Sequence, residues 1–306
     1  MRGVRSTLLL TALIAALAGV IARTQSPVSS DQRFRTGVEV ISVNATVTDA
    51  EGHLVTDLPR ESFELYEDGV QQTITQFSNE RVPVGLGLLL DISDSMFGRR
   101  LQDARTAVER FLIDLLTPDD EFFIMAFNHR PRVLTGWTRE PDLVRRTLDA
   151  LRPSGGTAVY DAIVQSLPLM AKRSRQRAAV VVISDGADTA SDATLRDIRS
   201  ALLRSDAFVY AVAIDSPERQ PINTRVNPAA LREITAESGG RTEIVQNSAD
   251  LTTSTESIAH ELNSQYLLGY SSIHATDGQY HSIRVKVSGS GFKVRARNGY
   301  VGVNGR

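Results

Sequence analysis

The stretch Asp91-Ile92-Ser93-Asp94-Ser95 follows directly on an apolar run, Val84 to Leu90. Such a run is typical of a buried central strand, so an aspartate and two serines at alternating positions stand where a strand ends and a loop begins. In an open α/β sheet, ligands bind at this carboxyl end of the strands. Carboxylate and hydroxyl oxygens suit hard cations such as Mg²⁺, Mn²⁺ or Ca²⁺, rather than zinc or copper.

Two further segments have a similar placement. Ser154-Gly155-Gly156-Thr157 precedes an apolar helical run, and Ser184-Asp185-Gly186 follows a second buried strand that we predict over 178–183. Each segment alone has an ordinary structural interpretation, either as helix-capping hydroxyls or as a turn.

Together the three segments resemble the metal-ion-dependent adhesion site of von Willebrand factor A (VWA) domains. The resemblance implies one bound divalent cation, with Mg²⁺ preferred over Mn²⁺ or Ca²⁺. It also implies that a carboxylate of a partner protein takes an open coordination position, because three of the five ligands are neutral hydroxyls. The implied metal ligands are Asp91, Ser93, Ser95, Thr157 and Asp185.

The composition is that of an ordinary globular protein. The chain has 306 residues, 42% of them hydrophobic and 23% charged, and this length allows two domains. A net charge of −2 gives no indication of nucleic-acid binding. The chain has no cysteine, which excludes disulfides and zinc sites of the cysteine type.

Residues 1–22 have the pattern of a signal peptide. Arg2 and Arg5 form a basic start, an apolar stretch follows, and Ala18 and Ala22 each end an A-x-A-like cleavage pattern. An uncleaved anchor is the alternative, although the stretch is short for a membrane span. In either case we expect the body of the chain to be exported, as a periplasmic, secreted or cell-surface protein.

From residue 83 to residue 263 the sequence predicts a doubly wound, Rossmann-like α/β domain, which is the VWA domain. Nearly continuous apolar runs indicate parallel strands that are covered on both faces. Amphipathic helices lie between these runs, and 131–137 is expected to add an antiparallel edge strand. The predicted parallel strands are 84–91, 122–127, 178–183 and 208–214.

The pattern on both sides of this domain is β. A polar linker at 23–35 is followed by alternating strands in 36–82, and further alternating strands occupy 264–303. Neither segment has enough strands for a stable sandwich alone. We therefore expect the two to pair into one antiparallel β-sandwich with the VWA domain inserted; separate modules are the alternative.

Segments in both β portions also resemble a bacterial VWFA-related domain family. Tyr66-Glu-Asp-Gly69 resembles part of its leading segment, and Asp277-Gly-Gln-Tyr-His281 part of its trailing segment. Glu67-Asp68-Gly69 is in addition a hairpin signal, with Ile74 expected on the return strand.

These features favour an extracytoplasmic, adhesion-type module that binds a protein partner's Asp or Glu carboxylate through the metal. A scaffold or assembly subunit of a cell-envelope complex is the alternative, and a metal-dependent hydrolase is the more remote one. We expect no enzyme, because the sequence has no G-x-S-x-G, H-E-x-x-H, Walker or Rossmann fingerprint and its five histidines are scattered. His129 follows a strand and could approach the metal; otherwise it is an exposed loop histidine. No membrane insertion is expected beyond the N-terminal segment.

Overall fold

The computed structural model describes residues 39–184, 188–214 and 228–303. The predicted signal peptide (1–22) and linker (23–35) lie outside the described residues. Among the helices that are described, none combines the length and the apolar character needed to cross a bilayer.

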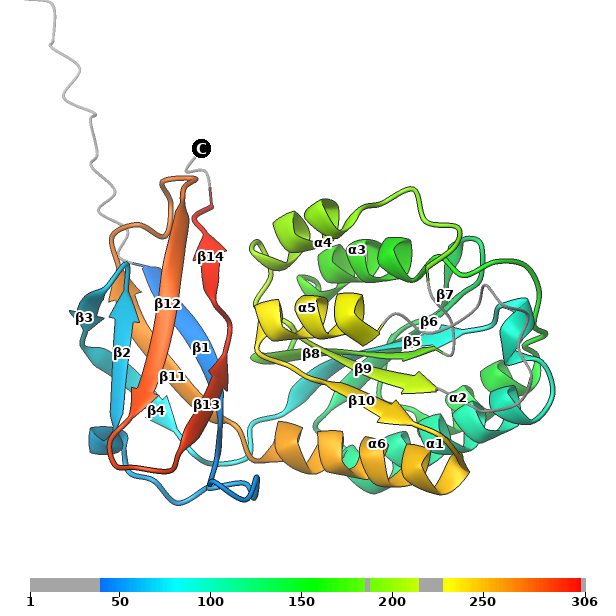
Figure 1. The fold of residues 1–306 in the computed structure, drawn as a ribbon, viewed down its shortest axis with the longest axis horizontal. Coiled ribbons are helices and arrows are strands. Elements are labelled where there is room, and N and C mark those ends of the chain that lie inside the picture. The colour runs from blue at the N-terminus through cyan, green and yellow to red at the C-terminus, as the bar shows by residue number, and fades with distance from the viewer. Residues whose placement is uncertain (1–38, 185–187, 215–227, 304–306) are drawn as a thin grey trace, which may run out of the picture. The chain divides into compact units, whose positions relative to one another are not determined.

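The described part of the α/β region contains a six-stranded sheet in the order β10-β9-β8-β5-β6-β7 (Figure 1). Neighbouring strands are parallel except for β6 and β7, which are antiparallel. The strands are β5 (Val84–Asp91), β6 (Glu121–Phe127), β7 (Pro131–Thr138), β8 (Arg177–Ser184), β9 (Phe208–Ile214) and β10 (Thr242–Val245). The predicted mostly parallel sheet with an antiparallel edge strand is therefore confirmed.

Helices cover both faces of this sheet, which gives three layers (Figure 1). One face carries α1 (Arg99–Leu115), α2 (Pro141–Asp149) and α6 (Ser248–Asn263). The other face carries α3 (Val159–Met170), α4 (Leu195–Leu202) and α5 (Pro228–Ser238).

The central strands are buried on both faces, which explains their continuous apolar sequence. In β8, Val181 and Ile183 belong to the core under α1 and α6, whereas Val180 and Val182 belong to the core under α3 and α4. Gly87 of β5 is required by close packing, because a Cβ there would lie 2.7 Å from the ring of Phe123.

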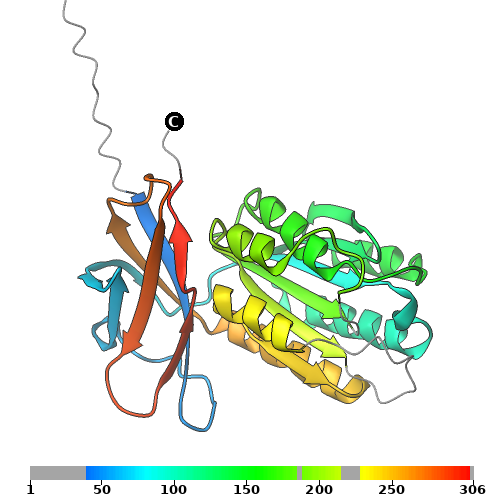
Figure 2. The ribbon, with the colours of Figure 1, turned by 45° about the horizontal axis from the view of Figure 1, so that its top comes forward.

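The remaining strands form two antiparallel sheets, in the orders β13-β1-β11-β4 and β14-β12-β2-β3 (Figure 2). The first half of the chain supplies β1 (Glu39–Thr48), β2 (Phe63–Glu67), β3 (Val70–Gln72) and β4 (Ile74–Ser78). The C-terminal part supplies β11 (Tyr266–Ser272), β12 (Tyr280–Val287), β13 (Lys293–Ala296) and β14 (Gly299–Val301).

Each of these sheets joins strands from both ends of the chain. β1 pairs with β11 and β13, and β2 pairs with β12. The two sheets enclose one apolar core that includes Val43, Leu65, Leu268 and Ile283. The fold class, an α/β domain inserted into an antiparallel β-sandwich, is therefore as predicted.

The hairpin at Asp68-Gly69 is confirmed, but the strand that follows it is shorter than expected. Both turn residues have positive φ, 49° and 81°, as a two-residue hairpin of type I′ requires. The return strand β3 ends at Gln72, and the prediction that Ile74 lies on it is wrong. Ile74 begins β4 and pairs with Tyr270 in the other sheet, because the chain crosses over to bury this side chain in the sandwich core.

Candidate metal site at the end of strand β5

Asp91 is the last residue of β5 and is fully buried. One carboxylate oxygen accepts a hydrogen bond of 2.8 Å from the Ser93 N–H, and the other accepts one of 2.5 Å from the Ser184 hydroxyl. The first bond turns the chain sharply out of the strand and into a 3-10 turn, η2 (Asp94–Met96). The buried strand thus holds the carboxylate at the carboxyl edge of the sheet.

Ser93 and Ser95 lie beside this carboxylate with their hydroxyls together. Their Oγ atoms are 2.8 Å apart; Ser93 is buried and Ser95 is half-buried. The Arg100 guanidinium donates a 2.9 Å hydrogen bond to the Ser95 carbonyl and so fixes the loop. In an octahedral Mg²⁺ site with bonds of 2.0–2.1 Å, neighbouring oxygen ligands stand about 2.9 Å apart.

The second predicted segment is joined to this loop by its backbone. The Ser154 N–H donates to the Ile92 carbonyl, and the Asp94 N–H donates to the Gly155 carbonyl, both at 2.9 Å. Gly155 has a φ of 77°, in the left-handed region that favours glycine. This turn brings Thr157, which is buried, to the same edge as Asp91.

Thr157 is fixed by a third segment, at Thr189 and Ala190. Its carbonyl accepts hydrogen bonds from both of their N–H groups, at 2.8 and 3.0 Å, and its own N–H donates to the Thr189 hydroxyl at 3.0 Å. Asp185, the fifth predicted ligand, lies outside the described residues.

Two polar residues of this edge were not predicted from the sequence. Ser184 donates to the Asp91 carboxylate, and Asn128 donates from its side chain to the Ser154 hydroxyl at 3.1 Å. Both stand at the ends of parallel strands, which is the signal that could have identified them. His129, the histidine that we considered, is exposed, and its ring lies against Gly155, where an added Cβ would be 2.9 Å from Nδ1.

These residues fit a divalent cation by their chemistry and by their spacing. The donors are all oxygen, and the two serine oxygens already have the separation of neighbouring ligands. A buried carboxylate needs compensating charge or hydrogen bonds, and a cation beside Asp91 would add to the two bonds described above. Three of the predicted ligands are uncharged, so the ion would keep affinity for a further carboxylate.

Comparison with known proteins gives a family match in the same part of the chain. A family model described as the von Willebrand factor type A domain matches residues 86–187. The mouse inter-alpha-trypsin inhibitor heavy chain H2 is 25% identical over 185 residues, which cover 53% of this chain and 19% of the mouse chain. An uncharacterized protein of Synechocystis is 29% identical over 117 residues, covering 37% of this chain and 28% of that protein. The chain thus matches less than a third of the length of either relative.

Solved structures show the same fold. A von Willebrand factor type A protein from Catenulispora acidiphila superposes with a TM-score of 0.51 at 13% identity, over 88% of this chain and 76% of that one. An aerotolerance-related membrane protein from Bacteroides fragilis has a TM-score of 0.51 at 22% identity, over 59% and 98% of the two chains.

The VWA relatives support a protein-interaction module. The matched range 86–187 contains most of β5 and all of β6 and β7, together with β8, whereas β9 and β10 lie beyond it. The family model thus assigns a VWA domain to residues 86–187 of this chain, and the mostly parallel six-stranded sheet with helices on both faces agrees with that assignment.

Proposed function

We propose that this protein is an extracytoplasmic binding module of the adhesion type. It binds one divalent cation, Mg²⁺ before Mn²⁺ or Ca²⁺, and through it the carboxylate of a partner protein. The proposed ligands are Asp91, Ser93, Ser95, Thr157 and Asp185. The observation that carries the proposal is the pair of serine oxygens 2.8 Å apart beside the buried Asp91 carboxylate.

The residues around the ion favour binding over turnover. When bound, the cation offers an electrophilic position to an oxygen ligand from outside. Asp91 is itself hydrogen-bonded to Ser93 and Ser184, so besides binding the ion it holds the loop and balances charge. The exposed side chain of Phe97 follows η2 directly and offers apolar surface beside the loop, as a protein partner would use.

The first experiment tests the ion alone. Titration calorimetry of the full chain with MgCl₂ and MnCl₂ should give one bound ion, and Asp91→Ala should abolish it while the circular dichroism stays native. Asp103→Ala is the matched control, because it removes a half-buried aspartate of α1 that is not a proposed ligand and that pairs with Arg99 at 3.8 Å. An unchanged affinity of Asp91→Ala for Mg²⁺ or Mn²⁺ would contradict the proposed site.

The second experiment tests the partner. Proteins captured from an envelope extract on the immobilised chain should be released by a chelator and should be absent with Asp91→Ala. A scaffold subunit would instead co-purify with a stable partner before any capture step. Capture that is equally strong for both chains, with and without chelator, would contradict a metal-bridged carboxylate.

A further inference from the structure

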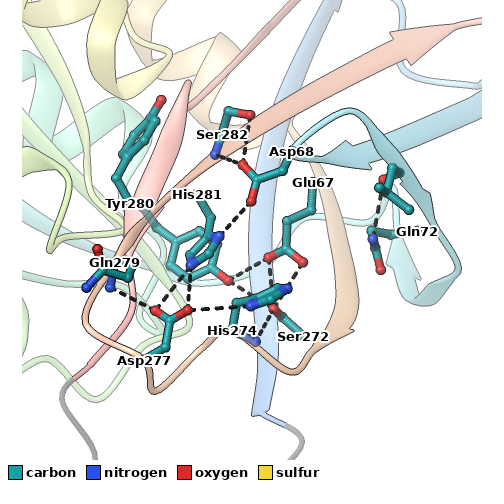
Figure 3. A network of polar contacts seen from close by, with 12 residues as sticks. Glu67, Asp68, Gln72, Ser272, His274, Asp277, Gln279, Tyr280, His281 and Ser282 are labelled. Atoms are coloured by element: carbon teal, nitrogen blue, oxygen red, sulfur yellow. Dashed lines mark hydrogen bonds and ion pairs between the residues drawn. The ribbon is translucent and has the colours of Figure 1, made fainter.

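A second group of metal-ligating side chains lies in the β-sandwich, on the segment that leads from β11 into β12 (Figure 3). His274, Asp277 and His281 each offer one ligand atom, and these three atoms lie within 4.8 Å of one another. We propose that these three residues bind a divalent transition metal ion of the Zn²⁺ class. This inference does not depend on the proposed function of the VWA domain.

The distances are close to those of a metal site. Asp277 Oδ2 lies 3.4 Å from His274 Nδ1 and 3.0 Å from His281 Nε2. In a tetrahedral zinc site with bonds of 2.0–2.2 Å, neighbouring donor atoms stand about 3.3 Å apart. Two of the three donor pairs therefore already have the separation that a bound ion would impose.

The orientation of His281 is the strongest argument. Its Nδ1 lies 2.7 Å from a carboxylate oxygen of Asp68, and its Nε2 faces both oxygens of Asp277, at 3.0 and 3.1 Å. If Nδ1 carries the proton and donates it to Asp68, the lone pair of Nε2 points at a carboxylate. Two acceptors in this position need a positive charge between them, which is either a proton or a metal ion.

A carboxylate behind a ligating histidine is the usual outer partner of metal-bound imidazole. Asp68 has this position because the type I′ turn places it beside β12, where the N–H of Ser282 also donates to it at 2.8 Å.

Hydrogen bonds fix the Asp277 side chain and the backbone at His274 before any ion arrives. Asp277 Oδ1 accepts from the Gln279 N–H at 2.8 Å, and the His274 N–H donates to the Ser272 hydroxyl at 3.0 Å. Ser272 is itself bound to the buried carboxylate of Glu67, at 2.8 Å (Figure 3). The rings of His274 and His281 stack, with centroids 4.6 Å apart and planes 21° from parallel, so the exposed His274 ring must turn before its nitrogen can point at an ion bound by His281.

The site is open to solvent on one side. The His281 side chain is only 8% exposed, whereas those of His274 and Asp277 are 44% and 34% exposed. An ion can therefore enter, and three protein ligands leave at least one coordination position for water or another ligand. Two imidazoles and one carboxylate favour Zn²⁺ and its transition-metal neighbours over Mg²⁺, so this site differs chemically from the all-oxygen site at Asp91.

The test uses the full chain without an affinity tag of histidines. Calorimetric titration with ZnCl₂ should give one ion per chain, and Co²⁺ should give a visible absorption band of the same stoichiometry. His274→Ala and Asp277→Asn should abolish both signals. Asp68→Asn should weaken the affinity about 10- to 100-fold, as expected for loss of an outer partner.

Two variants serve as controls. His53→Ala removes another histidine beside an aspartate, since His53 Nδ1 lies 3.2 Å from Asp49, but that pair is exposed and has no third ligand among the described residues. Asp91→Ala removes the proposed Mg²⁺ site. Both controls should bind Zn²⁺ like the unmodified chain.

The proposal is overturned if the unmodified chain binds no stoichiometric Zn²⁺, or if His274→Ala and Asp277→Asn bind it equally well. His274 is half exposed, so its alanine variant keeps the test valid even if Asp277→Asn fails to fold. Binding that disappears in His53→Ala as well would show surface association and would equally contradict the site.

Discussion

Asp120 carries a prediction about stability that is independent of metal binding. Its carboxylate is fully buried and accepts four hydrogen bonds at the start of the sheet. One oxygen accepts from the Val84 N–H at 2.8 Å; the other accepts from the Thr117 N–H at 2.7 Å, from the Thr117 hydroxyl and from Arg81. We expect Asp120→Asn to destabilise the protein strongly.

The magnitude follows from these contacts. Asparagine keeps one acceptor for Val84, but its NH₂ group then faces the Thr117 N–H, which loses its partner at a cost of about 1–3 kcal/mol. The ion pair with Arg81 is lost as well, at about 0.5–1 kcal/mol, because Arg81 is 30% exposed and screened by solvent. A flipped amide leaves the Val84 N–H unpaired instead, so the total remains about 1.5–4 kcal/mol.

Urea unfolding, followed by circular dichroism, measures this loss. Asp119→Asn is the matched control, because this neighbouring aspartate is exposed, and we expect a change within about 0.5 kcal/mol. Mg²⁺ affinity should stay unchanged in both variants, since the strand from Val84 to Asp91 separates Asp120 from the proposed metal by about 23 Å. A loss below 0.5 kcal/mol in Asp120→Asn, or equal losses in the two variants, would refute the reasoning.

Two further predictions concern a helix cap and the N-terminus. Thr194→Ala should lower the melting temperature by about 2–4 °C at pH 7, because Thr194 and Asp197 form a capping box at α4. The hydrogen bonds of Thr194 lower the pKa of Asp197 below its usual 3.8. The stability that the capping box contributes is therefore present above pH 3.8 and is lost as the pH falls through the folded-state pKa of Asp197. Melting temperatures of the unmodified chain and of Thr194→Ala should accordingly converge between pH 7 and pH 3. For export, N-terminal sequencing of the protein from its native host should find cleavage after Ala18 or Ala22, and a cytoplasmic product that starts at Met1 would contradict it.

The buried strands could be predicted because burial on both faces determines which residue types a strand can contain. A strand covered on both faces must be apolar at every position, and the run predicted at 84–91 coincides with β5. Helix starts were less accurate. The sequence pattern predicts the last helix of the α/β region over 251–262. The helix α6 instead begins at Ser248, because Asn247 caps it by accepting hydrogen bonds from the N–H groups of Ala249 and Asp250.

Features that depend on distant pairing could not be predicted in this way. The alternating pattern around Ile74 is the same whichever sheet the residue joins. Its pairing with Tyr270 determines that it belongs to the sheet of β4 and β11. The candidate site at Asp91 could be predicted because Asp91, Ser93 and Ser95 stand two positions apart at the end of one strand. The group of His274, Asp277 and His281 in the sandwich could not be predicted, because it includes two of five scattered histidines. In addition, its outer carboxylate, Asp68, lies 213 residues before His281.

Two candidate cation sites of different chemistry change how a chelation experiment must be interpreted. EDTA binds both Mg²⁺ and Zn²⁺, so release of a partner by EDTA alone would not identify the site that holds it. Restoring one ion at a time resolves this, because an all-oxygen set favours Mg²⁺ and a set with two imidazoles favours Zn²⁺. If the carboxylate of the partner binds at Asp91, Mg²⁺ alone should restore capture in the unmodified chain and in His274→Ala, but not in Asp91→Ala. If Zn²⁺ alone restores capture of the partner, and His274→Ala abolishes this effect, the partner binds at the site in the β-sandwich instead.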